Sequence, residues 1–252
     1  MSLSARGVSV RFRNNKGIWD VSVRFGVGLH LLAGPNGSGK TTLLRIMVGD
    51  LRPSDGGVLV ADQVSTPSQL RAQVGYLPQG DDLPPMLTAR ETLDYAAWLS
   101  GADRKTRTAR VADVLELANL TDAAGTPARK LSGGTRRRLQ VGCALITGPA
   151  VLVCDEPANG LDVDERRRLT AHLARVAQSR PVIVSSHHGG EWIGAARTAL
   201  VLRDGRAVYS GGIDDFLAGP GGQHHTTLAF DDAYAQWGER HEHAQARSRD
   251  QG

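Results

Sequence analysis

Hydrophobic and polar residues alternate along the chain with two different periods, which predict strands and helices. Near the start, the two-residue period that is typical of strands covers segments 7–12, 19–25 and 28–34. Between residues 91 and 119 the apolar residues instead recur at helical spacing, in two stretches joined by a polar link at 101–108. The chain therefore changes from strands to helices after its first third.

The second half of the chain returns to strands that alternate with helices. Two continuous apolar runs suit strands that are buried on both faces of a parallel sheet, and a helical pattern lies between them. The two runs are 150–157 and 181–187, and the helix is 164–178. Segment 198–211 predicts a hairpin that turns at the pair Asp204-Gly205. This alternation predicts a layered α/β core.

The same pattern suggests how the chain divides. We expect one domain over 1–218, with a core formed by about 1–79 and 130–218 and an inserted, all-helical lobe at about 80–129. Beyond the GPGGQHH stretch the composition becomes polar, so we expect a mobile tail over 219–252.

This tail holds half of the histidines of the chain. They are His224, His225, His241 and His243. They could bind a metal, but no Cys or acidic framework accompanies them to set a coordination geometry, so a solvated tail is the favoured interpretation. The segment 228–237 could form one short docked helix.

Composition describes an ordinary soluble protein of 252 residues, with 40% hydrophobic and 22% charged residues. The formal net charge is +4, and 26 of the 30 cationic residues are Arg. This excess is only weak evidence for a polyanionic partner. Cys143 and Cys154 lie in apolar surroundings without metal-binding spacing, so we expect reduced, buried thiols.

The sequence shows no pattern typical of a signal peptide or of a membrane-spanning helix. The first residues contain no apolar segment of the kind that a signal peptide needs. The longest uncharged run, Leu139 to Cys154, has 16 residues, whereas a spanning helix needs about 20 apolar residues. We therefore expect that the chain does not cross a membrane by itself.

A glycine-rich loop is the first motif that carries chemistry. The sequence GPNGSGKT fits the phosphate-loop pattern G-x-x-x-x-G-K-[ST], with a strand before it and a helix after it. Its glycines let backbone N–H groups converge on phosphate oxygens, Lys40 neutralises the β and γ phosphates, and Thr41 offers its hydroxyl to Mg²⁺. We expect ATP to contact Gly34, Pro35, Asn36, Gly37, Ser38, Gly39, Lys40, Thr41 and Thr42.

A pair of acids at the end of the 150–157 run narrows the class of nucleotide enzyme. Asp155 would reach the Mg²⁺ shell at the carboxyl edge of the sheet, and Glu156 would orient or deprotonate a water for attack on the γ-phosphate. Taken alone, adjacent acids at a strand end could equally form a solvated turn. No N-K-x-D motif is present, which disfavours a GTPase.

A third motif, LSGGT at 131–135, places a Ser-Gly-Gly turn directly before a basic, helix-prone segment, as in an anion site at a helix N-terminus. The phosphate loop, LSGGT, VLVCDEP and GLD follow one another in that order, with Gln79 in YLPQ and His187 in VIVSSH. Over about residues 5 to 215 this set resembles the ATP-binding-cassette (ABC) ATPases. The ordered set is far more specific than any one of its members.

The resemblance implies a fold and an assembly. The fold is α/β, a P-loop NTPase core with a mixed sheet, an antiparallel β subdomain and an inserted all-helical signature subdomain. Two cassettes would pair head to tail in an ATP-dependent homodimer, or with a second cassette subunit. Each ATP would then lie on one phosphate loop and against Ser132, Gly133 and Gly134 of the other chain.

The resemblance also implies roles for single residues. Gln79 matches the loop that touches the Mg²⁺ and water region, and Thr41 and Asp155 complete the expected metal set. His187 matches the switch histidine that contacts the γ-phosphate, and Asp162 the loop that crosses the dimer interface. Phe12 falls where the family stacks an aromatic ring on adenine.

Several of these residues have a second interpretation. Phe12 could be a core residue, and His188 is a neighbouring alternative to His187. The runs 136–138 and 166–168 are all Arg; they could form a nucleic-acid surface, but no aromatic residues are interleaved with them, so we interpret them as helix-face charges and expect no nucleic acid. Thr135 replaces the common Gln of the signature loop, and Cys154 a larger residue; neither removes a catalytic group.

ATP hydrolysis is the expected chemistry, with ATP and Mg²⁺ as ligands. The resemblance implies a transporter ATPase subunit, peripheral on the cytoplasmic face of the cell membrane, that drives a membrane-spanning permease in a separate chain. The helical lobe is where the family receives that partner. The motif sequences look most like the ABC-2 exporter group, so export is favoured over import.

Two other classes are weaker. A soluble cassette ATPase of translation, DNA repair or cluster assembly would usually show two cassettes, long coiled coils or zinc-binding cysteines. A cassette without ATPase activity conflicts with the full set of catalytic residues. The transported molecule would not touch this subunit, so its sequence cannot name the substrate.

Overall fold

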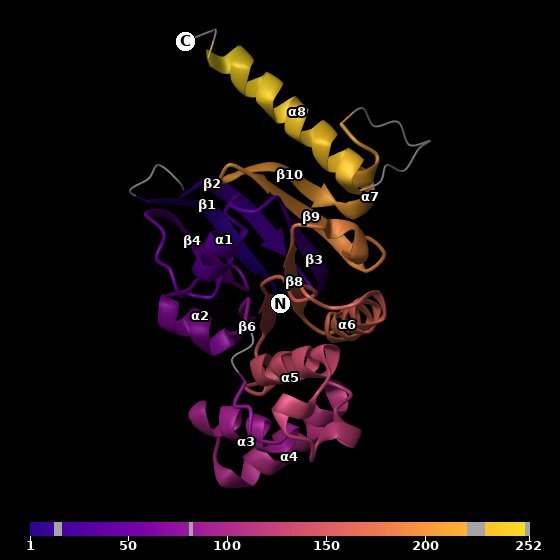
Figure 1. Ribbon diagram of the computed structural model, residues 1–252. Coiled ribbons are helices and arrows are strands. Elements are labelled where there is room, and N and C mark those ends of the chain that lie inside the picture. The colour runs from indigo at the N-terminus through magenta and orange to yellow at the C-terminus, as the bar shows by residue number, and fades with distance from the viewer. Residues whose placement is uncertain (13–16, 81–82, 221–229, 250–252) are drawn as a thin grey trace.

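The computed structural model describes residues 1–12, 17–80, 83–220 and 230–249. Two sheets lie side by side in its upper half, a group of helices forms its lower half, and one long helix projects at the opposite end (Figure 1). The predicted α/β fold with a mixed sheet, an antiparallel sheet and helices is confirmed.

A six-stranded mixed sheet forms the centre of the molecule. Its strands occur in the order β10 (Arg206–Gly212), β9 (Ala196–Arg203), β3 (Gly28–Ala33), β8 (Pro181–Ser186), β7 (Val151–Cys154) and β6 (Val74–Leu77). Strands β9, β3, β8, β7 and β6 are parallel, whereas β10 is antiparallel to β9. Every residue of β3, β7 and β8 is buried, which explains their continuous apolar sequences. The hairpin turns at Asp204-Gly205, where both residues have positive φ, as expected.

The second sheet is antiparallel and lies at one side of the first. It contains β2 (Gly17–Phe25), β1 (Leu3–Arg11), β4 (Asp55–Val60) and the short β5 (Gln63–Val64), in that order. Its apolar face packs on α1 (Lys40–Met47) and on one face of the central sheet, in a single buried cluster. The helix α1, which follows the phosphate loop, is therefore held between the two sheets.

The helices of the lower half have a hydrophobic cluster of their own. It joins α3 (Ala89–Leu99) and α4 (Arg104–Leu117) with Leu139 and Ile146 at α5 (Gly133–Leu145). The 3₁₀ turns η1 (Thr121–Ala123) and η2 (Ala128–Lys130) complete this part. Two other residues of α5, Val141 and Leu145, belong to the central core. Helix α5 thus packs on both parts of the molecule.

Helix α4 begins inside the segment that we expected to be a polar link. Asp103 is its N-cap, and its Oδ1 accepts hydrogen bonds from the backbone N–H groups of Lys105 and Thr106. The start is therefore determined by a side-chain cap, which periodicity alone did not reveal.

The remaining helices contribute buried residues to the hydrophobic clusters on the two faces of the central sheet. They are α2 (Pro67–Gln73), α6 (Val163–Val176), the turn η3 (Gly189–Trp192), α7 (Ile213–Leu217) and α8 (Phe230–Arg249). Cys143 and Cys154 are free, and burial raises the pKa of each thiol to about 12. No helix in the described part of the chain is both long and apolar enough to span a membrane.

The C-terminal segment differs from the expected tail with one short helix. Helix α8 has 20 residues, and Phe230 and Ala233 in its first turns are buried in the central core. Trp237 donates a hydrogen bond to the Phe216 carbonyl, and its ring lies tilted against that of Tyr209 with centroids 4.6 Å apart. His224 and His225 lie outside the described residues, and His241 and His243 lie on the far half of α8. Among the residues whose positions are described, no group of three or more His, Cys, Asp or Glu side chains that could hold a metal ion occurs.

Candidate functional site

The phosphate-loop sequence forms the turn between β3 and α1. Gly34, Gly37 and Gly39 have positive φ values of 150°, 83° and 103°. A side chain at Gly34 would also place its Cβ 2.4 Å from the Leu202 carbonyl oxygen. Only glycine combines this backbone conformation with such close neighbours. The loop therefore has the shape in which N–H groups at the start of a helix can surround phosphate oxygens.

Lys40, the first residue of α1, lies with its ammonium inside this loop. Its Nζ donates to the carbonyl oxygens of Gly34 at 2.8 Å and Pro35 at 3.2 Å, and lies 3.6 Å from Glu156 Oε1. Burial lowers the pKa of Lys40, while the charge of Glu156 opposes that shift. The ammonium is a positive charge held at the centre of the loop, where nucleotide phosphates would need it.

Asp155 follows the last residue of β7 and is completely buried. Ser185 on β8 donates its hydroxyl hydrogen to Asp155 Oδ1 and accepts the backbone N–H of Glu156 at 2.8 Å. Asp155 Oδ2 has no hydrogen-bond partner among the described residues. A buried carboxylate oxygen without a partner requires compensation, and Mg²⁺ or a water of its shell fits that requirement.

Glu156 lies at the meeting point of four segments. Its Oε1 faces Lys40, and its Oε2 lies 3.4 Å from Gln79 Nε2 and 3.3 Å from His187 Nδ1. Glu156 is 9% exposed and has a φ of 44°, which is unusual for a residue with a side chain. Such strain is held by the surrounding structure and gathers at functional positions.

Asn159 is a member of this group that sequence reasoning missed. Its Nδ2 lies 3.5 Å from Glu156 Oε2, at the limit of a hydrogen bond. The available signal was its position in DEPANGLD, between Glu156 and Asp162, on the turn that carries both acids.

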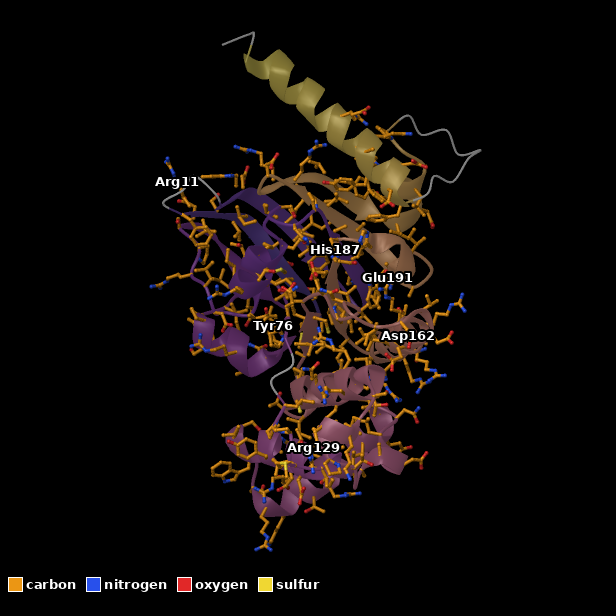
Figure 2. The ribbon with its side chains drawn as sticks, viewed as in Figure 1. Arg11, Tyr76, Arg129, Asp162, His187 and Glu191 are labelled. Carbon is orange, nitrogen blue, oxygen red and sulfur yellow. The ribbon has the colours of Figure 1, made fainter. Side chains whose placement is uncertain are left out.

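Lys40, Glu156 and Asn159 line one cavity of about 970 Å³, whereas the buried Asp155 does not reach its wall. Its wall contains Phe12, Asn36, Gly37, Gly39, Lys40, Thr41, Thr42, Gln79, Glu156, Asn159 and His187. Phe12 is 40% exposed and is therefore a cavity residue and not a core residue. His187 lines the cavity, whereas His188 is exposed beside it, with ring centroids 4.3 Å apart. Figure 2 shows His187 in the middle of the molecule and Arg129 in the lower, helical part.

The signature residues do not line this cavity. Ser132 is the N-cap of α5, and Gly133 and Gly134 form its first turn. A Cβ at Gly134 would lie 2.9 Å from the Glu165 side chain, so any larger residue there would require Glu165 to move. Asp162 likewise caps α6, accepting the Glu165 N–H at 2.8 Å (Figure 2). Within one chain, the fold thus brings together every segment expected at the site except the Ser132–Gly134 segment and the Asp162 segment.

Thr135, which replaces the common Gln of the signature loop, takes part in the cap of α5. Its backbone N–H donates to Ser132 Oγ at 3.2 Å, and its hydroxyl oxygen accepts from that same Ser132 hydroxyl at 3.0 Å. Thr135 Oγ1 also accepts from Arg138 Nη2 at 3.1 Å. A threonine here stabilises the first turn of the helix.

The expected helix-face role is wrong for Arg137. Its side chain is only 8% exposed, and its guanidinium donates to backbone carbonyls of two other segments. Arg136 and Arg138 instead bind carbonyls of the helical part, at Ala128 and Asn119. Burial of Arg137 depends on segments far away in the sequence, so the run of three arginines gave no sign of it.

Comparison with known proteins identifies the family to which this chain is similar. A family model described as "ABC transporter" matches residues 20–159. The chain is 38% identical over 194 residues to the Nod factor export ATP-binding protein I of Ralstonia nicotianae, covering 75% of this chain and 60% of that protein. It is 36% identical over 217 residues to the Fe(3+) ions import ATP-binding protein FbpC of Streptomyces coelicolor, covering 83% and 61%.

The structural comparison agrees on the fold. CbiO1 from Clostridium perfringens, part of the ABC transporter complex CbiONQ, superposes with a TM-score of 0.79 at 20% identity, over 86% of this chain and 90% of that one. The chain spans about 60% of the length of the two sequence relatives named above.

Proposed function

Because this chain belongs to the ABC transporter family, we propose that it hydrolyses ATP and that this hydrolysis powers transport through a separate membrane-spanning partner. The observation that supports hydrolysis is the position of Glu156. Its carboxylate faces a cavity together with Lys40, Gln79 and His187, next to the buried carboxylate of Asp155.

The proposed mechanism assigns each residue an action that its position allows. The N–H groups of the 34–39 loop and the ammonium of Lys40 hold the β and γ phosphates. Asp155 and Thr41 would hold Mg²⁺, which supplies positive charge to the phosphate oxygens as the bond to the leaving ADP breaks. Phe12 offers its ring face to the adenine.

Glu156 acts on the water in this proposal. Its carboxylate accepts a hydrogen bond from a water that attacks the γ-phosphorus, and the proton of that water passes to the carboxylate as ADP leaves. Gln79, Asn159 and His187 surround Glu156 Oε2, so they restrict the directions in which the carboxylate can point.

A second chain completes the site in our proposal. Ser132–Gly134 begins a helix of 13 residues, whose N-terminus has free N–H groups and a positive dipole end. That N-terminus lies outside the cavity of its own chain. Head-to-tail pairing of two cassettes would bring it, with Asp162, to the phosphates held by the partner.

The helical part offers a surface for the membrane-spanning partner. Tyr95, Trp98 and Leu99 are 44%, 58% and 63% exposed, and their spacing places them on one face of α3. The rings of Tyr95 and Trp98 stack with centroids 5.9 Å apart. A cluster of exposed aromatic side chains is typical of a protein-binding surface.

The direction of transport rests on the sequence motifs. Their likeness to the ABC-2 group favours export, while the relatives named above include both an exporter and an importer by their names. Export therefore stays a prediction. Association with the partner would hold the chain at the inner membrane surface.

Glu156→Gln tests the hydrolytic role. The amide cannot accept the proton of water, so kcat should fall by about 100-fold or more, while a fluorescent ATP analogue binds with nearly unchanged affinity. Glu116→Gln, the same change at an exposed position of α4, is the matched control. A Glu156→Gln protein that hydrolyses ATP at the wild-type rate would remove Glu156 from this role.

Purification from native membranes tests the partner. A stoichiometric multi-spanning protein should accompany the wild-type chain, and Trp98→Ala should weaken that association without changing the ATPase rate of the isolated chain. Recovery with ribosomes or DNA and no membrane protein would support a non-transport cassette instead.

A further inference from the structure

We propose that Arg137 is a positioning residue for ATP hydrolysis, which connects the signature helix to both Gln79 and Glu156. The proposal rests on the ATPase function argued above. It goes beyond that function because Arg137 does not line the nucleotide cavity, and because its action would pass through the backbone of two loops.

One side of the guanidinium holds the loop that carries Glu156. Arg137 Nε donates to the Pro157 carbonyl at 2.9 Å. Its Nη2 lies 3.2 Å from the Asp155 carbonyl oxygen and 3.3 Å from that of Glu156. Three consecutive carbonyls of the turn that contains both acids therefore face one side chain of α5.

The other side of the guanidinium holds the loop that carries Gln79. Arg137 Nη1 lies 3.2 Å from the Gly80 carbonyl oxygen and 3.4 Å from that of Pro78, the residues on either side of Gln79. Gln140, one turn further along α5, accepts from Arg137 Nη1 at 2.8 Å and donates to the Gly80 carbonyl at 2.9 Å. This second residue strengthens the link between α5 and the Gln79 loop.

The chemistry of arginine suits this arrangement. Its planar guanidinium has N–H groups that point in several fixed directions, so one side chain can donate to two loops at once. A lysine ammonium is a compact charge and cannot reproduce that fork. A buried carbonyl group that loses its hydrogen-bond donor costs free energy. Both loops are therefore held in the positions in which their carbonyl groups accept hydrogen bonds from Arg137. The unusual φ of Glu156, 44°, lies inside this network.

Packing of α5 does not depend on the guanidinium. Val141 and Leu145 already fix the helix to the central core, and Leu139 and Ile146 fix it to the helical part. Because α5 begins at the signature residues, a shift of this helix would move the Gln79 loop and the Glu156 turn together. Hydrolysis would then depend on the position of the signature helix, and ATP binding by one chain would not.

The test compares Arg137→Gln and Arg137→Lys with wild type in the full-length chain. We measure kcat, KM for MgATP, the affinity of the monomer for a fluorescent ATP analogue, and the fraction folded. For Arg137→Gln we expect kcat to fall about 30-fold, since small misplacements of catalytic groups reduce rates by factors of up to about 100. Affinity and KM should stay within about threefold, and Arg137→Lys should recover only part of the loss.

The matched control is Arg180→Gln. Arg180 also donates to a backbone carbonyl, that of Pro149 at 2.7 Å, but before β7 and thus at the opposite end of the strand from Asp155. The kcat of Arg180→Gln per folded molecule should stay within about twofold of the wild-type value. If Arg137→Gln fails to fold, the Lys variant, which keeps the charge, carries the comparison.

Two results would overturn the proposal. One is a kcat per folded molecule near the wild-type value despite lower stability, which would make Arg137 a purely structural residue. The other is a parallel loss of affinity and kcat, which would indicate general damage to the site. An inactive wild-type protein that binds ATP would instead contradict the proposed function, so the two failures are distinguishable.

Discussion

Acidification should destabilise this protein through one buried histidine, His172. This residue lies on α6, is 5% exposed, and neither ring nitrogen has a hydrogen-bond partner among the described residues. Burial lowers its pKa to about 4 from 6.5, and the charges of Arg138 and Arg175 act in the same direction. The folded protein therefore keeps His172 neutral under conditions in which the unfolded chain would protonate it.

The sign and size of the effect follow from these two pKa values. Between pH 6.5 and about 4 the unfolded state binds more protons at this site, so the free energy of unfolding falls as pH falls. Well above pH 6.5 the site is neutral in both states and contributes almost nothing to the pH dependence. From pH 7.5 to pH 5.0 the two values give a loss of about 2 kcal/mol from this residue.

The assay is urea unfolding at pH 7.5, 6.0 and 5.0 for wild type and His172→Leu. Other groups also titrate, including His30, whose pKa burial lowers too, so the measured quantity is the difference between the two proteins. Wild type should lose about 2 kcal/mol more than His172→Leu over this range. Equal pH dependence in the two proteins would show that His172 is not held neutral by burial.

Three further predictions concern the site and its supports. Asp155→Asn should raise the free energy of unfolding of the metal-free protein by about 1 kcal/mol, because it removes a buried charge with an unpartnered oxygen. The same change should abolish Mg²⁺-dependent hydrolysis. Urea unfolding measures the stability and an ATPase assay measures the hydrolysis, and unchanged activity would contradict the metal role. Ser132→Arg should leave ATP binding by the monomer intact and prevent ATP-induced dimerisation in a Glu156→Gln background, as measured by size-exclusion chromatography; loss of monomer binding would refute pairing in trans. Gly189→Ala should cost about 1–3 kcal/mol, since its Cβ would lie 2.2 Å from the Phe230 ring; a double-mutant cycle with Phe230→Ala should recover part of that cost, and additive losses would refute the contact.

Local features of the sequence were sufficient for the phosphate loop and the strands around it. The loop depends on backbone conformations that glycine alone adopts easily, and this requirement belongs to a few consecutive residues. The continuous apolar runs similarly indicate burial on both faces, which parallel strands need. For this reason the α/β fold and the hairpin at Asp204-Gly205 could be predicted without a structure. The order of the motifs could be read directly from the sequence.

The family resemblance supplied the candidate residues, but the sequence could not supply their surroundings. It did not indicate Asn159 beside Glu156, the full length of α8, or Asp103 as the cap that starts α4. Each of these depends on a side chain or a docking surface whose effect is not visible in the period of apolar residues.

The burial of Arg137 shows most clearly what the tertiary structure decided. In the sequence it is the middle member of three arginines, and helix geometry alone assigns it to a charged face. In the fold its partners are carbonyls 20 and 57 residues away, at Pro157 and Gly80. Local sequence determines which backbone shapes and which apolar faces are possible, whereas the partners of a long polar side chain are determined only when distant segments pack together.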